Sequence, residues 1–207
     1  MAIQLPAAPL EEARKAFLAG DYNATIFHAK AATESAQWDE EARELHIRAL
    51  LTTGQYTNAL TVTTNALGKL STSVRLLWVA HEAHRFNNQP KEATAALTEM
   101  NRLATQMTWR YRGAPDLAVL GRMALLDGAD PKLVLERLYD AAEKSDPASR
   151  VVPLAKGELA LSKSDFTLAS RVYQIALKKF PNDAEIHFGV AKSFESSDRK
   201  MMQKHLE

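Results

Sequence analysis

Short turn sequences recur in this chain at a fixed interval, and this period restricts the folds that the chain can adopt. Gly20-Asp21-Tyr22, Gly54-Gln55-Tyr56 and Asn88-Gln89-Pro90 are equally spaced along the chain. After an irregular stretch, Ser164-Asp165-Phe166 and Asp198-Arg199-Lys200 are separated by the same interval. A fixed period of about 34 residues is typical of a helical solenoid, in which each repeat stacks on its neighbours.

Each repeat has the hydrophobic pattern of two amphipathic helices joined by a turn. In residues 40–53 the apolar side chains recur at helical spacing. Gly54 ends this segment, because glycine tolerates the positive φ of a helix C-terminus. A second helix is expected over residues 56–67, and Pro181 ends the corresponding helix of a later repeat, since proline cannot continue a helix. The pattern predicts an all-α fold of antiparallel helix pairs.

The repeat that begins near Arg150 carries small, aromatic and proline residues at fixed positions. These positions are Gly157, Ala160, Ser164-Asp165-Phe166, Ala169, Tyr173, Ala176-Leu177 and Pro181. The pattern resembles the tetratricopeptide repeat (TPR) family. The resemblance implies a right-handed superhelical solenoid of about five repeats and a partial sixth, in a single domain over residues 1–207. The repeats are expected near residues 6–39, 40–73, 74–107, 114–149, 150–183 and 184–207.

The fourth repeat departs most from the pattern. Its segment from Gly121 to Pro147 is two residues longer than the family spacing, and Asp127-Gly128-Ala129-Asp130-Pro131 predicts a longer turn. Six further residues are inserted before it, around Trp109 and Tyr111. One interpretation of this insertion is a lengthened helix and loop. The other is a contact at the rim of a binding surface, since Trp, Tyr and Arg are enriched at interaction hot spots.

The sixth repeat lacks the closing positions of its second helix. Solenoid ends normally carry a polar capping helix, so we expect a fragment of a longer protein, or an end that pairs with another copy of the chain. Self-association through this uncapped end would bury apolar side chains that are expected to lack partners. These side chains are Val190, Phe194, Met201, Met202 and Leu206.

Composition excludes several classes of function. The 26 basic and 25 acidic side chains nearly balance, which argues against a protein dedicated to nucleic acids or membrane surfaces. The absence of cysteine excludes disulfides and thiolate metal sites. No apolar run has the length of a membrane span, so no membrane insertion is expected. The first residues lack the features of a signal peptide; the chain is expected in the cytoplasm, or in the periplasm or outside the cell if a signal peptide has been removed.

Catalytic and metal-binding motifs are not evident in the sequence. His81-Glu82-Ala83-His84 is one residue short of the zinc motif His-Glu-x-x-His, and both histidines fall at inward packing positions. There is no Gly-x-Ser-x-Gly turn and no phosphate-binding loop. Carboxylates such as Glu40-Glu41 and Asp183-Glu185 stand at helix starts, where the helix dipole stabilises negative charge. We therefore expect no enzymatic activity, no metal site and no cofactor.

In proteins of this resemblance, the first helix of each repeat lines a concave face. The positions expected to face the groove are Arg14, Arg48, Trp78, Glu82, Arg85, Phe86, Arg122, Leu154, Glu158, Phe188 and Lys192. Arginine is frequent in this set and pairs with carboxylates in bidentate geometry, which favours an acidic or C-terminal peptide as the ligand. The alternative is a solvated basic face that binds nothing. The carboxylate clamp for Hsp70 or Hsp90 tails is not expected, because Leu10, Arg14 and Leu45 replace its Lys and Asn residues.

The leading prediction is a non-enzymatic module that binds a peptide or a partner helix of another protein. A second hypothesis rests on two short phrases, Gly121-Arg122 through Asp130-Pro131 and Ser197-Asp198-Arg199-Lys200. They resemble repeat arrays of long bacterial proteins, some of which carry a zinc metallopeptidase domain next to the repeats. This chain would then be the substrate- or partner-handling arm of an enzyme whose catalytic domain lies outside it.

Overall fold

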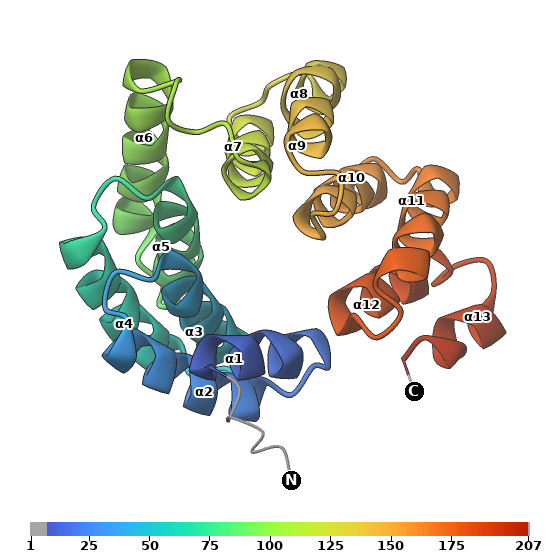
Figure 1. The fold of residues 1–207 in the computed structure, drawn as a ribbon. Coiled ribbons are helices and arrows are strands. Elements are labelled where there is room, and N and C mark those ends of the chain that lie inside the picture. The colour runs from blue at the N-terminus through green and yellow to red at the C-terminus, as the bar shows by residue number, and fades with distance from the viewer. Residues whose placement is uncertain (1–7, 207) are drawn as a thin grey trace, which may run out of the picture. The chain divides into compact units, whose positions relative to one another are not determined.

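The structure, a computed structural model, describes residues 8–206 and consists of helices joined by short turns (Figure 1). The helices are α1 (Pro9–Leu18), α2 (Tyr22–Ser35), α3 (Glu40–Thr52), α4 (Tyr56–Lys69), α5 (Val74–Phe86), α6 (Pro90–Gln106), α7 (Ala114–Leu126), α8 (Pro131–Val134), the π-helix η1 (Leu135–Tyr139), α9 (Asp140–Ser145), α10 (Val151–Ser162), α11 (Phe166–Lys179), α12 (Ala184–Ser193) and α13 (Arg199–Lys204). No strand occurs in residues 8–206. The prediction of an all-α fold of helix pairs is confirmed.

The chain divides into two compact units, and the division falls inside α6, between Arg102 and Leu103. The first unit contains α1 to α5 and most of α6. The second unit contains the end of α6 and all later helices. The single repeat domain expected from the sequence stays a prediction, and each unit is described by itself below.

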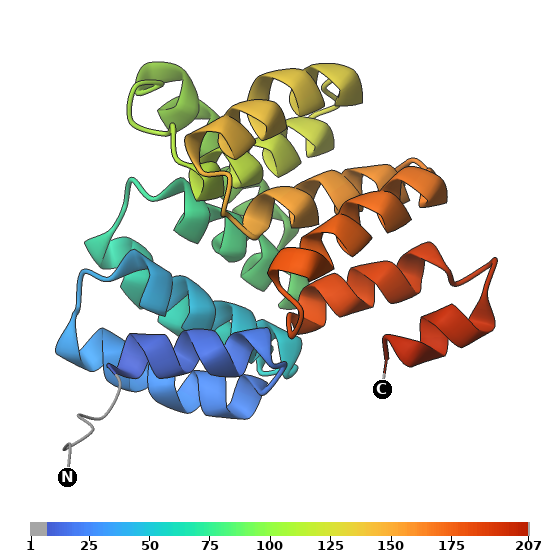
Figure 2. The same cartoon turned by 45° about the vertical axis from the view of Figure 1, so that its right-hand side comes forward.

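In the first unit, the second helices α2 and α4 each pack against two first helices. Helix α2 contacts α1 and α3, and α4 contacts α3 and α5. The first helices also touch one another, α1 against α3 and α3 against α5. Figure 2 shows the antiparallel pairing of α1 with α2 and of α3 with α4. Small residues such as Ala59 and Ala66 on α4 are fully buried against Ile47 and Leu76, and they allow the three helices α3, α4 and α5 to approach closely.

Four of the five recurring turn sequences, and the longer turn of the fourth repeat, have a common backbone geometry. The residue with positive φ in these turns is Gly20 (76°), Gly54 (75°), Asn88 (56°), Gly128 (86°) or Ser164 (57°), whereas the turn at Asp198 has no such residue. The next residue is often an N-cap. Asp21 accepts a hydrogen bond from the Ala24 amide at 2.9 Å, and Asp165 accepts one from the Leu168 amide at 2.9 Å. One residue thus ends the first helix and the next one begins the second helix, which explains why this pair of positions repeats.

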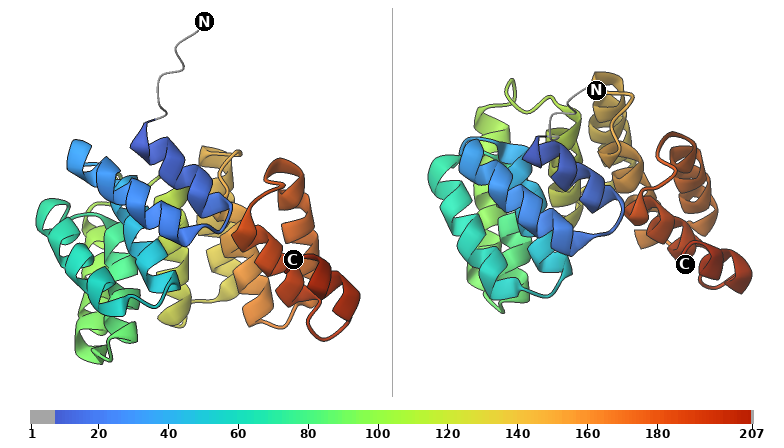
Figure 3. Two further views of the ribbon diagram at one scale, coloured as in Figure 1. Left: turned by 90° about the horizontal axis from the view of Figure 1, so that it is seen from below. Right: turned by 60° about the horizontal axis from the view of Figure 1, so that its bottom comes forward.

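The second unit has the same arrangement of pairs, with α10 touching both α7 and α12 and with α11 packed between α10 and α12. Figure 3 shows these pairs from two further directions. The buried ring of Tyr173 on α11 lies between Gly157 on α10 and Gly189 on α12. A Cβ atom on either glycine would overlap the ring. Glycine is therefore required sterically at both positions, where the first helices meet α11.

The two extra residues of the fourth repeat lie in its turn and in its second helix. The turn between α7 and α8 has four residues, 127–130, whereas the turn between α10 and α11 has three, 163–165. The other extra residue is taken up by the π-helix η1, a form that inserts one residue into a helical turn. Buried Val134 and Tyr139 are consequently five positions apart, whereas the equivalent Ala169 and Tyr173 are four apart. The ring of Tyr139 still packs against Gly121, as Tyr173 packs against Gly157.

The C-terminal helices correct one expectation from the sequence. Val190 is fully buried, and Phe194 is half-buried in the same cluster with Tyr173 and Ile186. The prediction that Val190 and Phe194 lack partners is wrong, because α11 already covers this side of α12. Leu206 is exposed, as expected. None of the helices in residues 8–206 is both long and apolar enough to cross a membrane.

Candidate protein-interaction surface

The residues predicted to face a groove all lie on first helices. Arg14 is on α1, Arg48 on α3, Trp78, Glu82, Arg85 and Phe86 on α5, Arg122 on α7, Glu158 on α10 and Lys192 on α12. Each of these nine side chains is half-buried or exposed, and Phe188 on α12 is exposed too. We call the side of the first helices that carries these residues the first-helix face of each unit: residues on α1, α3 and α5 in the first unit, and on α7, α10 and α12 in the second. Leu154 on α10 was also predicted to face the groove, and this prediction is wrong, because Leu154 is 5% exposed and packs in the core cluster with Tyr173.

Arginine–glutamate pairs connect neighbouring first helices in the first unit. The guanidinium of Arg14 on α1 donates to both carboxylate oxygens of Glu41 on α3, with Nε–Oε1 2.6 Å and Nη2–Oε2 2.5 Å. These hydrogen bonds lower the pKa of the Glu41 carboxyl below its ordinary value. Arg75 on α5 pairs with Glu44 on α3, and Arg48 lies over the ring of Phe17 at 5.1 Å. Arg14, Arg48 and Arg75 are therefore already engaged in contacts within the fold.

Helix α5 carries four of the predicted groove residues, and the last two, Arg85 and Phe86, are exposed. Trp78, Glu82 and Arg85 follow one another at spacings of four and three residues and therefore share one side of the helix. Phe86 is 55% exposed, and its ring stacks on Tyr56 with the centroids 4.8 Å apart and the planes 5° apart. Arg85 is exposed and forms no hydrogen bond or ion pair with other residues in 8–206. The end of α5 thus offers an aromatic surface beside a free guanidinium.

The first-helix face of the second unit is also bridged by ion pairs. Arg122 on α7 donates from Nε to Oε2 of Glu158 on α10 at 2.8 Å. These two residues occupy equivalent positions in consecutive repeats, so opposite charges alternate along this face. Lys192 on α12 pairs with Glu195 at 2.6 Å. Phe188, next to these charges on α12, is 57% exposed.

The charges of the Arg122–Glu158 pair act on the pKa of the buried Tyr139. Tyr139 is 1% exposed, and its hydroxyl has no hydrogen-bond partner in the described part of the chain. Burial raises the pKa of this phenol to about 12, while the charge of Arg122 lowers the pKa and that of Glu158 raises it. Burial also raises the pKa of Tyr173 above its ordinary value. Both phenols are therefore neutral near pH 7.

The carboxylates assigned from the sequence to helix starts have a second role. Glu41 accepts the bidentate contact from Arg14, and Asp183 caps α12 while it accepts from both Nε and Nη2 of Arg150 at 2.5 and 2.8 Å. Arg150 also donates to Glu185 at 2.6 Å. These inter-repeat pairs were not predicted from the sequence. The signal that was available is an arginine followed by a carboxylate 27 to 36 residues later.

The residues proposed for the rim differ in their exposure. Trp109 is 65% exposed, in the segment between α6 and α7. Tyr111 is only 5% exposed, so the prediction that it forms part of a rim is wrong. Helix α6 runs to Gln106 and the linking segment follows it, which is the lengthened helix and loop considered from the sequence.

The histidines of α5 serve packing and turn contacts. His81 is 7% exposed, and its Nδ1 lies 3.0 Å from the carbonyl oxygen of Ala93 on α6. Burial lowers the pKa of His81, so the ring is neutral and Nδ1–H donates to this carbonyl. The Nδ1 atom of His84 lies 2.7 Å from Oε1 of Gln89 in the following turn. No group of three or more metal-ligating side chains occurs within residues 8–206.

The fold is similar to that of solved TPR proteins. TTC0263, a thermophilic TPR protein of Thermus thermophilus, aligns with 90% of this chain and 97% of its own, at a TM-score of 0.60 and 20% identity. Human IFIT1, solved as a dimer with PPP-AAAA, aligns with 89% of this chain and 45% of its own, at a TM-score of 0.59 and 12% identity. A chain of the APC/C hetero-tetramer Cut9-Hcn1 aligns with 96% of this chain and 38% of its own, at a TM-score of 0.55 and 12% identity.

No protein-family model matches the sequence, and no curated protein matches it significantly. The structural similarity extends over nine tenths of the chain, and the helix pairs agree with the repeat period read from the sequence. The chain therefore has a TPR-type fold, as the repeat sequence predicts.

Proposed function

We propose that this chain is a non-enzymatic interaction module that binds an extended peptide, or a helix of another protein, on the first-helix face of its first unit. The observation that carries the proposal is the end of α5, where exposed Phe86 stacks on Tyr56 beside the free guanidinium of Arg85. Aromatic and arginine side chains at the surface supply most of the binding energy in protein interfaces. Trp78, about two turns earlier on the same helix, extends this surface.

The scaffold under this surface is held in place before any ligand arrives. The pairs Arg14–Glu41 and Arg75–Glu44 join α1 to α3 and α3 to α5. Asn87 donates to the carbonyl oxygen of Tyr56 at 2.8 Å and holds the end of α5 against the start of α4. Because these helices are already fixed, the conformational cost of binding falls mainly on the ligand.

The ion pairs also narrow the chemistry of the ligand. A strongly acidic peptide would have to displace the carboxylate that Arg14 already binds. Among the residues predicted to face the groove, Arg85 is the arginine that can bind a carboxylate of the ligand without displacing another contact. The preferred ligand therefore has an apolar or aromatic anchor for Phe86 and Trp78, and one acidic group placed to meet Arg85.

Selection of random peptides against the full chain, followed by fluorescence anisotropy with purified peptides, tests this function. The Phe86→Ala and Arg85→Glu variants are each expected to weaken the selected peptides about tenfold, the range of interface hot spots. Phe27→Ala is the matched control, because Phe27 is 71% exposed but lies on the second helix α2. Equal affinity of the parent and both α5 variants would contradict the proposal.

If the chain is the arm of a larger enzyme, the same surface would bind the substrate or partner of that enzyme. This hypothesis differs in the neighbouring sequence of the parent reading frame, where it requires a His-Glu-x-x-His motif. A free-standing adaptor requires none. Reading that frame separates the two hypotheses without affecting the proposed binding surface.

A further inference from the structure

A pocket of about 300 Å³ opens in the second unit between α9, α10 and α11. This volume is at the lower end of the range for binding pockets in proteins. Val152 on α10 and Val172, Ile175 and Ala176 on α11 give it an apolar lining. Lys156 also lines it, whereas Glu158, two residues later, belongs to the first-helix face. Two residues correspond to a rotation of about 200° around a helix, so the pocket lies on the opposite side of α10 from that face.

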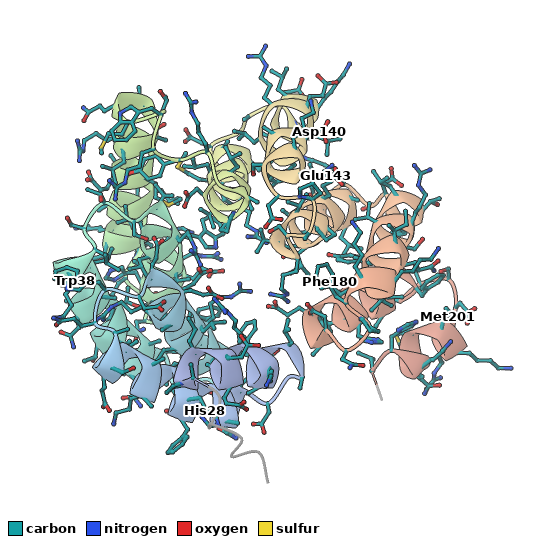
Figure 4. The ribbon with its side chains drawn as sticks, in the orientation of Figure 1. His28, Trp38, Asp140, Glu143, Phe180 and Met201 are labelled. Carbon is teal, nitrogen blue, oxygen red and sulfur yellow. The ribbon has the colours of Figure 1, made fainter. Side chains whose placement is uncertain are left out.

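Polar contacts fix both sides of the pocket. On one side, Lys156 Nζ donates to Asp140 Oδ1 and to Glu143 Oε2, each at 2.7 Å, and ties α10 to α9. On the other side, Lys179 Nζ donates to the carbonyl oxygen of Pro147 at 3.2 Å and ties α11 to the segment after α9. Figure 4 labels Asp140 and Glu143 on α9 and Phe180 at the end of α11. The pocket is therefore formed without a ligand.

Two cations on α11 stand around an apolar centre of the pocket, and the lining also contains one acidic residue outside the Lys156 pairs, Asp146, whose Oδ1 accepts from the Ala148 amide at 3.0 Å. Arg171, Ile175 and Lys179 line the pocket at intervals of four residues on α11, and the two cations are about 12 Å apart along the helix. Ile175 is 53% exposed. Arg171 is exposed and has no hydrogen bond or ion pair in residues 8–206, and the one hydrogen bond recorded for Lys179 goes to a neutral carbonyl. Lys156, by contrast, is already neutralised by two carboxylates.

We propose that this pocket is a second docking site, which takes an acidic segment of a partner protein with one aliphatic side chain. The aliphatic side chain would enter between Val152 and Ile175, and carboxylates on either side of it would meet Arg171 and Lys179. An acidic occupant is favoured because Arg171 and Lys179 outnumber Asp146, the lining carboxylate outside the Lys156 pairs. The two cations are too far apart for a single carboxylate to meet both, so the segment needs at least two acidic residues. The site is independent of the first-helix face and of the function proposed for it.

Isothermal titration of the full chain with a synthetic peptide tests the site. The probe has one leucine with two glutamates on each side, and the reference peptide has serine in place of the leucine. Ile175→Glu is expected to weaken the leucine peptide about tenfold, and Arg171→Glu about fivefold. Lys178→Glu, which makes the same charge change on an exposed residue of α11 outside the pocket, is expected to change the affinity less than about twofold.

Several results would overturn the proposal. One is the absence of saturable binding at millimolar peptide. Another is an equal loss for Lys178→Glu and Arg171→Glu, which would indicate diffuse attraction to a basic helix. Displacement of the peptide by octanoate would assign the pocket to small amphiphiles instead. Loss of binding in Phe86→Ala would place the peptide on the first-helix face, and thermal melts of all variants confirm that they are folded.

Discussion

The fourth and fifth repeats have the same packing although their sequences differ in length. In the fourth repeat α7 packs against the segment formed by α8, η1 and α9, and in the fifth repeat α10 packs against α11. Each helix pair sets a buried tyrosine against a glycine of its first helix, Tyr139 on Gly121 and Tyr173 on Gly157. The longer pair places one extra residue in the turn and one in the π-helix. Both additions are outside the first helix, so Arg122 still stands opposite Glu158. The two extra residues are thus accommodated in the turn and the second helix, while the first helices keep the register of the first-helix face.

The strongest test of this comparison is a matched pair of single-residue deletions. Deletion of Ser170 brings Ala169 and Tyr173 to a spacing of three, which rotates one of them out of the core by about 100°. The free energy of unfolding should fall by about 4 kcal/mol, a loss typical of a disrupted core. Deletion of Glu136, an exposed residue of η1, should convert the π-helix to an α-helix. It restores the spacing of four between Val134 and Tyr139, and should cost less than about 1 kcal/mol.

Urea denaturation of the two deletion variants and the parent measures both values. Equal destabilisation by the two deletions would show that the π-helix is required in its own right. It would then not be a means of absorbing an inserted residue.

A somewhat smaller effect is expected from overpacking the regular pair. Gly157→Leu places a branched side chain where the ring of Tyr173 lies, and Tyr173 cannot retreat because Gly189 touches its other face. Overpacking of this kind costs about 3 kcal/mol, or about 10 °C in Tm for a chain of this size. Gly68→Ala on α4 is the control, because a Cβ there meets no atom within 4 Å. A Gly157→Leu melt identical to that of the parent would contradict the register of α10 and α11.

The smallest effect in this series is an alkaline loss of stability due to Tyr139. The unfolded phenol ionises near its ordinary pKa of 10, whereas the folded phenol ionises at about 12. Because the folded pKa of this acid is raised, the contribution of Tyr139 to the free energy of unfolding is complete below pH 10 and is lost as the pH rises toward 12. At pH 11 the loss from Tyr139 is about 1.4 kcal/mol. Urea denaturation at pH 9 and pH 11 measures this loss of stability. Between these two pH values, the free energy of unfolding should fall by about 1.4 kcal/mol less in Tyr139→Phe than in the parent. An equal loss in both proteins would contradict the burial of this hydroxyl.

Much of the fold follows directly from the sequence, because its turn chemistry is local. Gly54 predicts the end of α3, and the observed helix ends at Thr52, one residue short of the predicted boundary. The π-helix was not predicted, although the two extra residues were. A surplus residue between Val134 and Tyr139 can be accommodated in a turn or in a helix, and the choice depends on which of them keeps both side chains buried. That balance depends on α7 and α10, which are distant in sequence.

The candidate site was only partly accessible from the sequence. Repeat spacing places Arg14, Arg48 and Arg122 on first helices, because register alone determines this. It does not reveal that Arg14 and Arg122 are bound to carboxylates of the next repeat. Such pairs depend on side-chain reach between helices. Tyr111 was misjudged for a related reason: an inserted aromatic residue looks the same in sequence whether it packs inward or outward.

We propose that the first helices bind the peptide ligand, and tryptophans of the chain can report on this binding directly. Trp78 lies on the first-helix face, whereas Trp38 lies in the segment between α2 and α3, 62% exposed beneath Lys69. Their indole N–H signals can be followed by NMR during titration with a peptide selected against the full chain. We expect the Trp78 signal to shift in a saturable manner and the Trp38 signal to stay unchanged. A saturable shift of Trp38 with Trp78 unchanged would contradict the proposal.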